Sequence, residues 1–141
     1  MKRQQFKITI NAARERVWDV LLGTDTYPKW TAPFAEGSSV KTDWKKGSKT
    51  LFLDGQGSGM VSEIAENIPN EFLSIRHLGE YKDGVEDLES EWAGYLENYT
   101  LNTVDGKTEL RVDIDLNEDF NEYMLKTWPQ ALDKVKEMAE N

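Results

Sequence analysis

The stretch YTLNTVDGKTELRVDIDL, Tyr99–Leu116, decides the fold. It contains the dipeptide Asp105-Gly106, which favours a tight hairpin turn because both residues tolerate the positive φ angles that such a turn requires. After the turn, apolar residues alternate strictly with polar ones, at Leu110, Val112, Ile114 and Leu116. This pattern predicts an antiparallel β-hairpin with one buried face and one face exposed to solvent.

The segment after this hairpin, EDFNEYMLKTWPQALDKVKEMAEN, has the spacing of a long amphipathic helix. Its apolar residues recur at every third or fourth position, at Phe120, Met124, Trp128, Ala131, Val135 and Met138. Pro129 cannot donate a backbone hydrogen bond, so we expect a kink or the start of a new helix there. The apolar seam is expected to cover the buried face of the sheet.

The N-terminal part predicts a strand followed by two short helices. The segment QFKITIN alternates apolar and polar residues, and Asn11 is expected to cap the next helix. That helix, AARERVWDVLLG, has a broad apolar stripe and ends at Gly23. A second helical turn is expected to start at Thr24 or Asp25, with Pro28 at an early position.

The region from Gly37 to Leu116 predicts short antiparallel strands, with further reversals at Asp54-Gly55 and Asp83-Gly84. GQGSG is expected to be a hairpin turn, because a strand follows it and a phosphate-binding loop requires a helix there. The acidic run DGVEDLESEW is expected to be a solvated loop. The fold class is therefore α+β, with a curved antiparallel sheet around a long C-terminal helix, and residues 1–141 are expected to form a single domain.

The composition excludes several classes of function. The chain has no cysteine, which excludes disulfides and thiol chemistry. Its net charge of −9 disfavours binding to nucleic acid or to anionic membranes. No signal peptide or membrane span is recognisable, so a cytoplasmic location is expected. With one histidine in the chain and no cofactor fingerprint, neither a metal nor a cofactor is expected.

The chain resembles the START-like superfamily of helix-grip domains (SRPBCC), and within it the bacterial homologues of the activator of the heat shock protein ninety ATPase. The resemblance covers roughly residues 4–139 and is carried by five segments: ITINAARERVWDVLLGTDTYPKW, DWKKGSKTLFL, GMVSEIAENIPNEFLSIRHLG, ENYTLNTVDGKTEL and the terminal W..AL..VKEMAE. It implies a deep cavity between the sheet and the long helix, which binds apolar or amphipathic small molecules across the superfamily and supports catalysis in a minority of its members.

The stretch TYPKWTAPF places Tyr27, Trp30 and Phe34 close together. These aromatic residues either line the cavity or fill the core, and the core is the more frequent place for large aromatics. On the resemblance, the N-terminal half of the long helix would pass the cavity. The candidate ligand-binding residues are Tyr27, Trp30, Phe34, Phe52, Ile75, His77, Tyr95, Glu97, Tyr99, Tyr123, Thr127 and Trp128.

His77 is the candidate polar group of this cavity. It shares a strand face with Leu73 and Ile75, and a pair with Glu97 across the sheet is compatible with the spacing. The chain has no serine-nucleophile signature, so no residue is assigned a catalytic role.

Three functions are compatible with the sequence. The favoured one is binding of a hydrophobic or amphipathic small molecule. The alternatives are an enzyme of cyclase, dehydratase or hydrolase type, which is less favoured, and a protein that modulates a chaperone. Contact with a chaperone is compatible with the resemblance but not expected, because one fold hosts unrelated functions.

Overall fold

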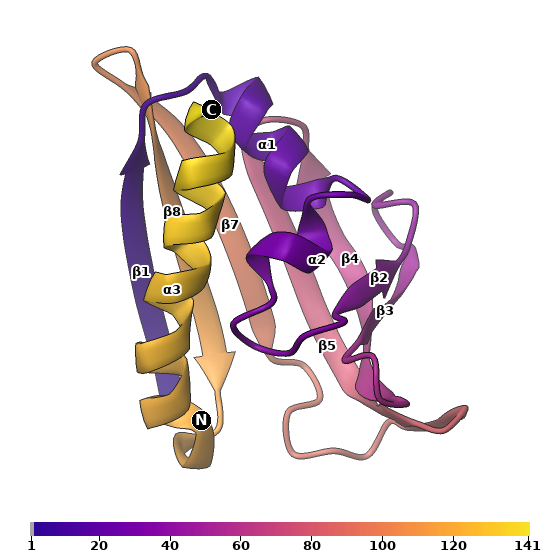
Figure 1. The fold of residues 1–141 in the computed structure, drawn as a ribbon. Helices are drawn as coiled ribbons and strands as arrows, with labels where there is room; N and C mark the ends of the chain where they lie inside the picture. Colours follow the sequence, from indigo (N-terminus) through magenta and orange to yellow (C-terminus); the bar gives the residue numbers. More distant parts are fainter. Residues whose placement is uncertain (1) are drawn as a thin grey trace.

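The computed structural model describes residues 2–141, and within them it shows a curved 8-stranded antiparallel sheet with all helices on one face (Figure 1). Met1, the first residue of the predicted domain, lies outside the described residues. The elements are β1 (Lys2–Ile10), α1 (Arg14–Leu22), α2 (Tyr27–Trp30), β2 (Ser39–Lys41), β3 (Lys49–Leu53), β4 (Ser58–Ile68), β5 (Phe72–Lys82), β6 (Val85–Asp87), β7 (Leu96–Val104), β8 (Lys107–Leu116), the 3₁₀ turn η1 (Glu118–Phe120) and α3 (Asn121–Glu140).

The sheet has the strand order β1-β8-β7-β5-β4-β3-β2, and β6 pairs with β5 outside this path. Two of the predicted Asp-Gly reversals are tight turns with positive φ at both residues, 52° and 79° at Asp105 and Gly106, and 48° and 86° at Asp83 and Gly84. The third reversal lies between β3 and β4, at the start of GQGSG, where Asp54 accepts hydrogen bonds from the backbone N–H groups of Gln56 and Ser58. The prediction of an α+β fold with an antiparallel sheet is confirmed.

Helix α3 lies along β1 and β8, and α1 and α2 cover the remaining part of the same face (Figure 1). The alternating residues of β8 that were predicted to be buried are 5% exposed or less. From the other side, α3 contributes Trp128, Ala131, Leu132, Val135 and Ala139 to the same core. The hairpin and the helix therefore form the two halves of one hydrophobic core, as the sequence predicts.

Four local predictions are wrong. Asn11 does not cap α1, which begins after Ala13 without a side-chain cap. Helix α2 starts at Tyr27, later than expected, although Pro28 does occupy an early position. Of the two alternatives expected at Pro129, the start of a new helix is wrong, because α3 continues through this residue, and a kink stays a prediction. Pro129 has no N–H to donate to the backbone carbonyl of Leu125, four residues earlier. Leu125 is exposed, so water can replace this donor.

The fourth wrong prediction concerns Phe120, which was expected in the core. It precedes α3, in η1, and its side chain is 48% exposed. A 3₁₀ turn rotates successive residues differently from an α-helix, so the helical spacing does not extend back to this position.

Two irregularities bend the central strands β4 and β5. Val61 pairs with Gly79 but Ser62 pairs with His77, so Leu78 is an extra residue on β5. A second shift leaves Ala65 extra on β4. Such bulges increase the local twist and bend a sheet. They also interrupt the two-residue alternation of side chains, which matters for the residues beyond His77.

Candidate functional site

A cavity of about 550 Å³ lies between α2, the concave face of the sheet and the start of α3. Its volume is within the range of about 300–1,000 Å³ that is typical of small-molecule sites. Nine of the candidate residues line it: Tyr27, Trp30, Phe34, Phe52, His77, Tyr95, Glu97, Tyr99 and Trp128. The structure thus brings together side chains from five separate parts of the chain.

Three candidate residues are not part of this wall. Ile75 is 2% exposed and belongs to the hydrophobic core. Thr127 is also buried, on the core-facing side of α3. Tyr123 is 44% exposed, and its hydroxyl donates to the backbone carbonyl of Phe34, 2.9 Å away. Helical and strand spacing place a side chain on a face but not at a particular point along it, so the sequence could not exclude these three residues from the wall. Their contact with a ligand stays a prediction.

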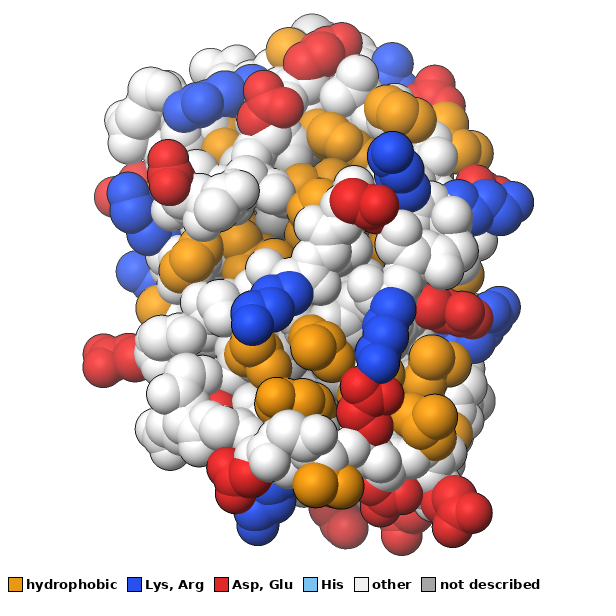
Figure 2. Space-filling model, turned by 90° about the vertical axis from the view of Figure 1, so that its right-hand side faces the viewer, with side chains coloured by type: hydrophobic (Ala, Val, Ile, Leu, Met, Phe, Trp, Pro, Cys, Tyr) orange, Lys and Arg blue, Asp and Glu red, His pale blue; other side chains and the backbone are white. Residues whose placement is uncertain are grey.

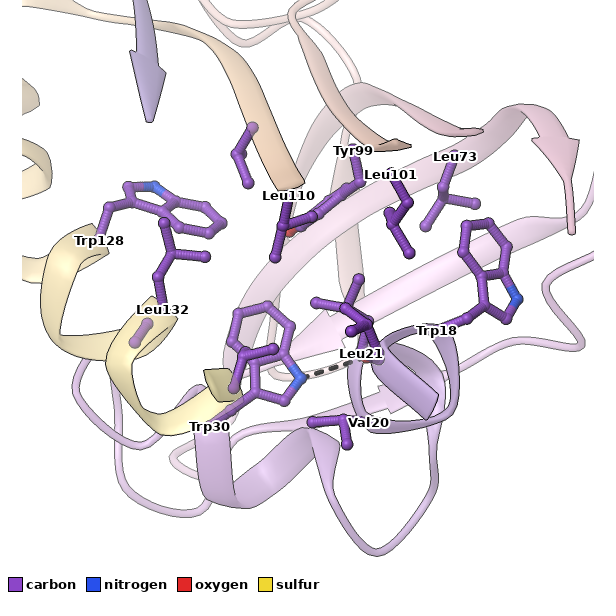
Figure 3. Close-up of a cluster of buried hydrophobic side chains, with 14 of the residues drawn as sticks. Trp18, Val20, Leu21, Trp30, Leu73, Tyr99, Leu101, Leu110, Trp128 and Leu132 are labelled. Carbon is purple, nitrogen blue, oxygen red and sulfur yellow. Dashed lines mark hydrogen bonds between the residues drawn. The ribbon is translucent and has the colours of Figure 1, made fainter. Parts of the chain in front are cut away.

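Trp30 belongs both to the core and to the wall of the cavity. Figure 3 shows its indole in one buried cluster with Tyr99 of β7 and Trp128 of α3. The indole N–H donates to the backbone carbonyl of Leu21, 3.2 Å away, and the side chain is 2% exposed. Its ring stands edge-on to that of Tyr27, with 5.4 Å between the centroids. The two interpretations of the aromatic residues in TYPKWTAPF therefore apply together.

A hydrogen-bonded chain of four polar side chains reaches into the cavity. The hydroxyl of Ser62 lies 2.7 Å from Nδ1 of His77, and Nε2 of His77 lies 3.2 Å from Oε1 of Glu97. The hydroxyl of Tyr99 donates to the other carboxylate oxygen, Oε2. His77 and Glu97 line the cavity, whereas Ser62 is fully buried behind them. Ser62 therefore positions the imidazole and is not available as a nucleophile.

The backbone of His77 also fixes the wall next to it. Its N–H donates to the carbonyl of Tyr95 at 2.8 Å, and its carbonyl accepts from the N–H of Gly94 at 2.7 Å. These two bonds hold the segment before β7 against β5, so that Trp92 and Tyr95 both line the cavity. Trp92 was missed in the sequence because it ends an acidic run. The large apolar side chain of this tryptophan was the one sign that the end of the acidic run packs against the rest of the protein.

The two tyrosine hydroxyls near Glu97 are held in their neutral form. Burial, followed by the negative charge of Glu97, raises the pKa of Tyr27 far above its ordinary value. The same two causes raise the pKa of Tyr99, to which its hydrogen bond with Glu97 contributes further. Both phenols therefore remain protonated through the physiological pH range, and Tyr99 remains a hydrogen-bond donor.

Three further carboxylates belong to the wall of the cavity. Asp54, Glu80 and Asp115 line it in addition to Glu97. Glu80 lies three positions after His77 on β5, and both side chains line the cavity. An odd spacing on one face is possible because the bulge at Leu78 shifts the alternation of side chains along β5. Within residues 2–141, no cluster of His, Asp or Glu side chains has an arrangement that could hold a metal ion.

An antiparallel sheet curved around a C-terminal helix, with a cavity between them, defines a helix-grip domain of the START-like class. The sequence matches the family described as Activator of Hsp90 ATPase homolog 1-like protein over residues 11–140. The chain belongs to this family, and the resemblance seen in the sequence is confirmed. None of the helices in the described part of the chain is long and apolar enough to span a bilayer.

Solved structures share the fold. The Aha1 dimer from Colwellia psychrerythraea has a TM-score of 0.75 and 23% identity, over 99% of this chain and 97% of that one. ChR145 from Cytophaga hutchinsonii has a TM-score of 0.74 and 22% identity, over 100% of this chain and 95% of that one. DynU16, from the dynemicin biosynthetic locus, has a TM-score of 0.76 and 15% identity, over 100% of this chain and 48% of that one. A comparison with curated proteins finds no significant match.

Proposed function

We propose that the protein binds a hydrophobic or amphipathic small molecule in the cavity between the sheet and α3. The observation that carries this proposal is the cavity of about 550 Å³, whose wall combines aromatic rings with a few polar groups. Ligand sites have this composition, because apolar walls supply affinity and a few polar groups fix the orientation of the ligand. The family and its fold are compatible with such binding.

A second candidate function is acid–base catalysis on the bound molecule. The observation that favours it is the contact between Nε2 of His77 and the carboxylate of Glu97 at the surface of the cavity. Such a pair can exchange a proton with a ligand group. Catalysis requires that His77→Gln abolishes turnover while the ligand still binds, whereas a binding function predicts that no turnover exists in the unaltered protein.

The proposal is tested with N-phenyl-1-naphthylamine, a neutral probe whose fluorescence rises in apolar cavities. We expect saturable binding with one site per chain. Ala35 lines the cavity and is partly exposed, so the ring of Ala35→Phe should occupy part of the cavity without disturbing the core. The variant should keep the thermal unfolding transition and bind the probe more weakly.

The matched control is Ala93→Phe, at an exposed position that does not line the cavity. This variant should bind the probe as the unaltered protein does. Equal probe binding by the folded Ala35→Phe variant would place the site elsewhere. Native mass spectrometry of freshly purified protein would then identify any small molecule that co-purifies.

A further inference from the structure

We propose that the cavity selects amphipathic molecules that carry a positively charged group, such as an alkyl- or arylammonium, over carboxylates of the same shape. This inference rests on the proposed function and specifies its ligand class. It follows from the position of Glu97, a carboxylate inside an aromatic cavity whose wall, among the residues that the structure describes, includes no lysine or arginine.

The other carboxylates of the wall are already compensated or exposed. Asp115 pairs with Nε of Arg3 at 2.9 Å and accepts the N–H of Leu96 at 3.0 Å. Asp54 accepts backbone N–H groups of its own turn, and Glu80 is exposed to water. Glu97 differs from these three, because its side chain is only 22% exposed and no Lys or Arg within residues 2–141 forms an ion pair with it.

His77 does not supply the missing positive charge. The Ser62 hydroxyl is fully buried, and its one hydrogen-bond partner in the described structure is Nδ1 of His77. A buried O–H needs an acceptor, so we assign Nδ1 as that acceptor and Nε2 as the protonated nitrogen that donates to Glu97. In this tautomer the imidazole is neutral. Glu97 accepts hydrogen bonds on both oxygens, as an ionised carboxylate does, and its charge is balanced by no protein cation.

The surroundings of this carboxylate suit an organic cation. The ring of Phe52 lies beside the imidazole of His77 and beside the ring of Tyr27, with centroid distances of 6.1 Å and 6.2 Å. Aromatic faces attract ammonium groups, particularly where water is excluded. Ile114, Leu116 and Met124 form an apolar part of the wall, contributed by β8 and α3, for the body of the ligand. A carboxylate ligand would instead place two negative charges together in a poorly solvated space.

The charge bias is a local property of the cavity. The side of the molecule seen in Figure 2 carries both signs of charge, with Lys and Arg side chains among Asp and Glu side chains around exposed hydrophobic groups. The wall of the cavity carries carboxylates without Lys or Arg. The net charge of −9 adds a general attraction for cations, but it does not distinguish one apolar cation from another.

The test compares three ligands with the same ten-carbon chain: decyltrimethylammonium, decanol and decanoate, each below its micelle concentration. Their dissociation constants are measured at neutral pH by displacement of N-phenyl-1-naphthylamine. We expect decyltrimethylammonium to bind at least about tenfold more tightly than decanoate, with decanol between them. The comparison is made on the unaltered protein, so it does not depend on any variant folding.

Glu97→Gln keeps the shape of the side chain and removes its charge, so the preference for the ammonium over decanoate should fall to about threefold or less. Glu109→Gln, on the outer face of β8, is the control and should keep the full preference. Equal binding of the three ligands, or tighter binding of decanoate, overturns this inference and leaves the proposed function intact. No displacement of the bound probe by any of the three also overturns this inference, whereas the proposed function fails only where the probe itself does not bind.

Discussion

The hydroxyl oxygen of Ser62 and Nδ1 of His77 lie 2.7 Å apart, on residues that pair directly across β4 and β5. Because Ser62 is fully buried, this bond selects one imidazole tautomer and directs the Nε2–H towards Glu97. The donor role of Nε2 in the cavity wall is therefore fixed by Ser62, which lies behind the wall and is not accessible to a ligand.

Ser62→Ala should destabilise the protein by about 1–3 kcal/mol, because it leaves a buried imidazole nitrogen without a partner. His77 is the one histidine of the chain, so its ring nitrogens give unambiguous ¹⁵N signals. We expect the unaltered protein to show a single tautomer, protonated at Nε2, and the variant to show a mixture. Ser74→Ala, on the other face of β5, should leave these signals unchanged. Unchanged signals in Ser62→Ala would contradict the selection of the tautomer by Ser62, and protonation at Nδ1 in the unaltered protein would contradict the assigned tautomer.

Trp30→Ala should cost about 3–5 kcal/mol of unfolding free energy, because the side chain is 2% exposed and packs from α2 against Tyr99 of β7 and Trp128 of α3. Trp30→Phe, which keeps a ring but loses the hydrogen bond to Leu21, should cost less. Urea unfolding measures both, and probe titration of the folded fraction measures binding. A loss below about 1 kcal/mol in Trp30→Ala would show that this ring is not part of the core.

Val112→Asp should destabilise the protein by about 4 kcal/mol or more, because it places a carboxylate in the core between Phe6 of β1 and Tyr99 of β7. Arg111→Ala, the neighbouring change on the outer face, should cost less than about 1 kcal/mol. Thermal unfolding of the two variants under identical conditions is the comparison. A normal transition for Val112→Asp would show that the buried face of β8 was assigned wrongly.

These positions show what could be predicted from the sequence. The alternation in β8 indicated the buried face because a hairpin with one wet face constrains every second residue. The same logic placed His77 on the concave face, but it could not reach Glu80, since the bulge at Leu78 leaves no mark in the polar–apolar pattern. Trp92 was missed because it ends an acidic run, and the tryptophan itself was the one local sign of its place. The backbone bonds that hold the segment before β7 against β5 have no local signature in the sequence.

Tyr99→Phe should reduce the loss of stability at alkaline pH. The pKa of Tyr99 lies well above its ordinary value of 10.0, mainly through burial and then through Glu97. As the pH rises through the ordinary pKa of 10.0, the unfolded chain releases the phenolic proton while the folded chain keeps it, so the unfolding free energy decreases. Urea unfolding from about pH 9 to about pH 11 should show a smaller decrease in the variant than in the unaltered protein. Equal decreases would contradict the raised pKa.

The family description predicts a chaperone activity that we do not expect. The match to the family and to solved structures below 25% identity establishes the scaffold, and one scaffold carries unrelated functions. Addition of this protein to a purified bacterial chaperone of the heat shock protein ninety class should leave its ATP turnover unchanged. A several-fold rise in turnover would contradict this prediction, whatever the cavity binds.

The extra residue Leu78 separates the core-packing part of β5 from the part that lines the cavity beyond His77. Up to His77 every second side chain faces the concave side, and after Leu78 this alternation is shifted by one residue. Insertion or deletion of a single residue at this bulge would therefore exchange Glu80 for a neighbour at the cavity while Leu73 and Ile75 stay in place. Related chains could acquire a different ligand chemistry by such a step, without rebuilding the interior that keeps them folded.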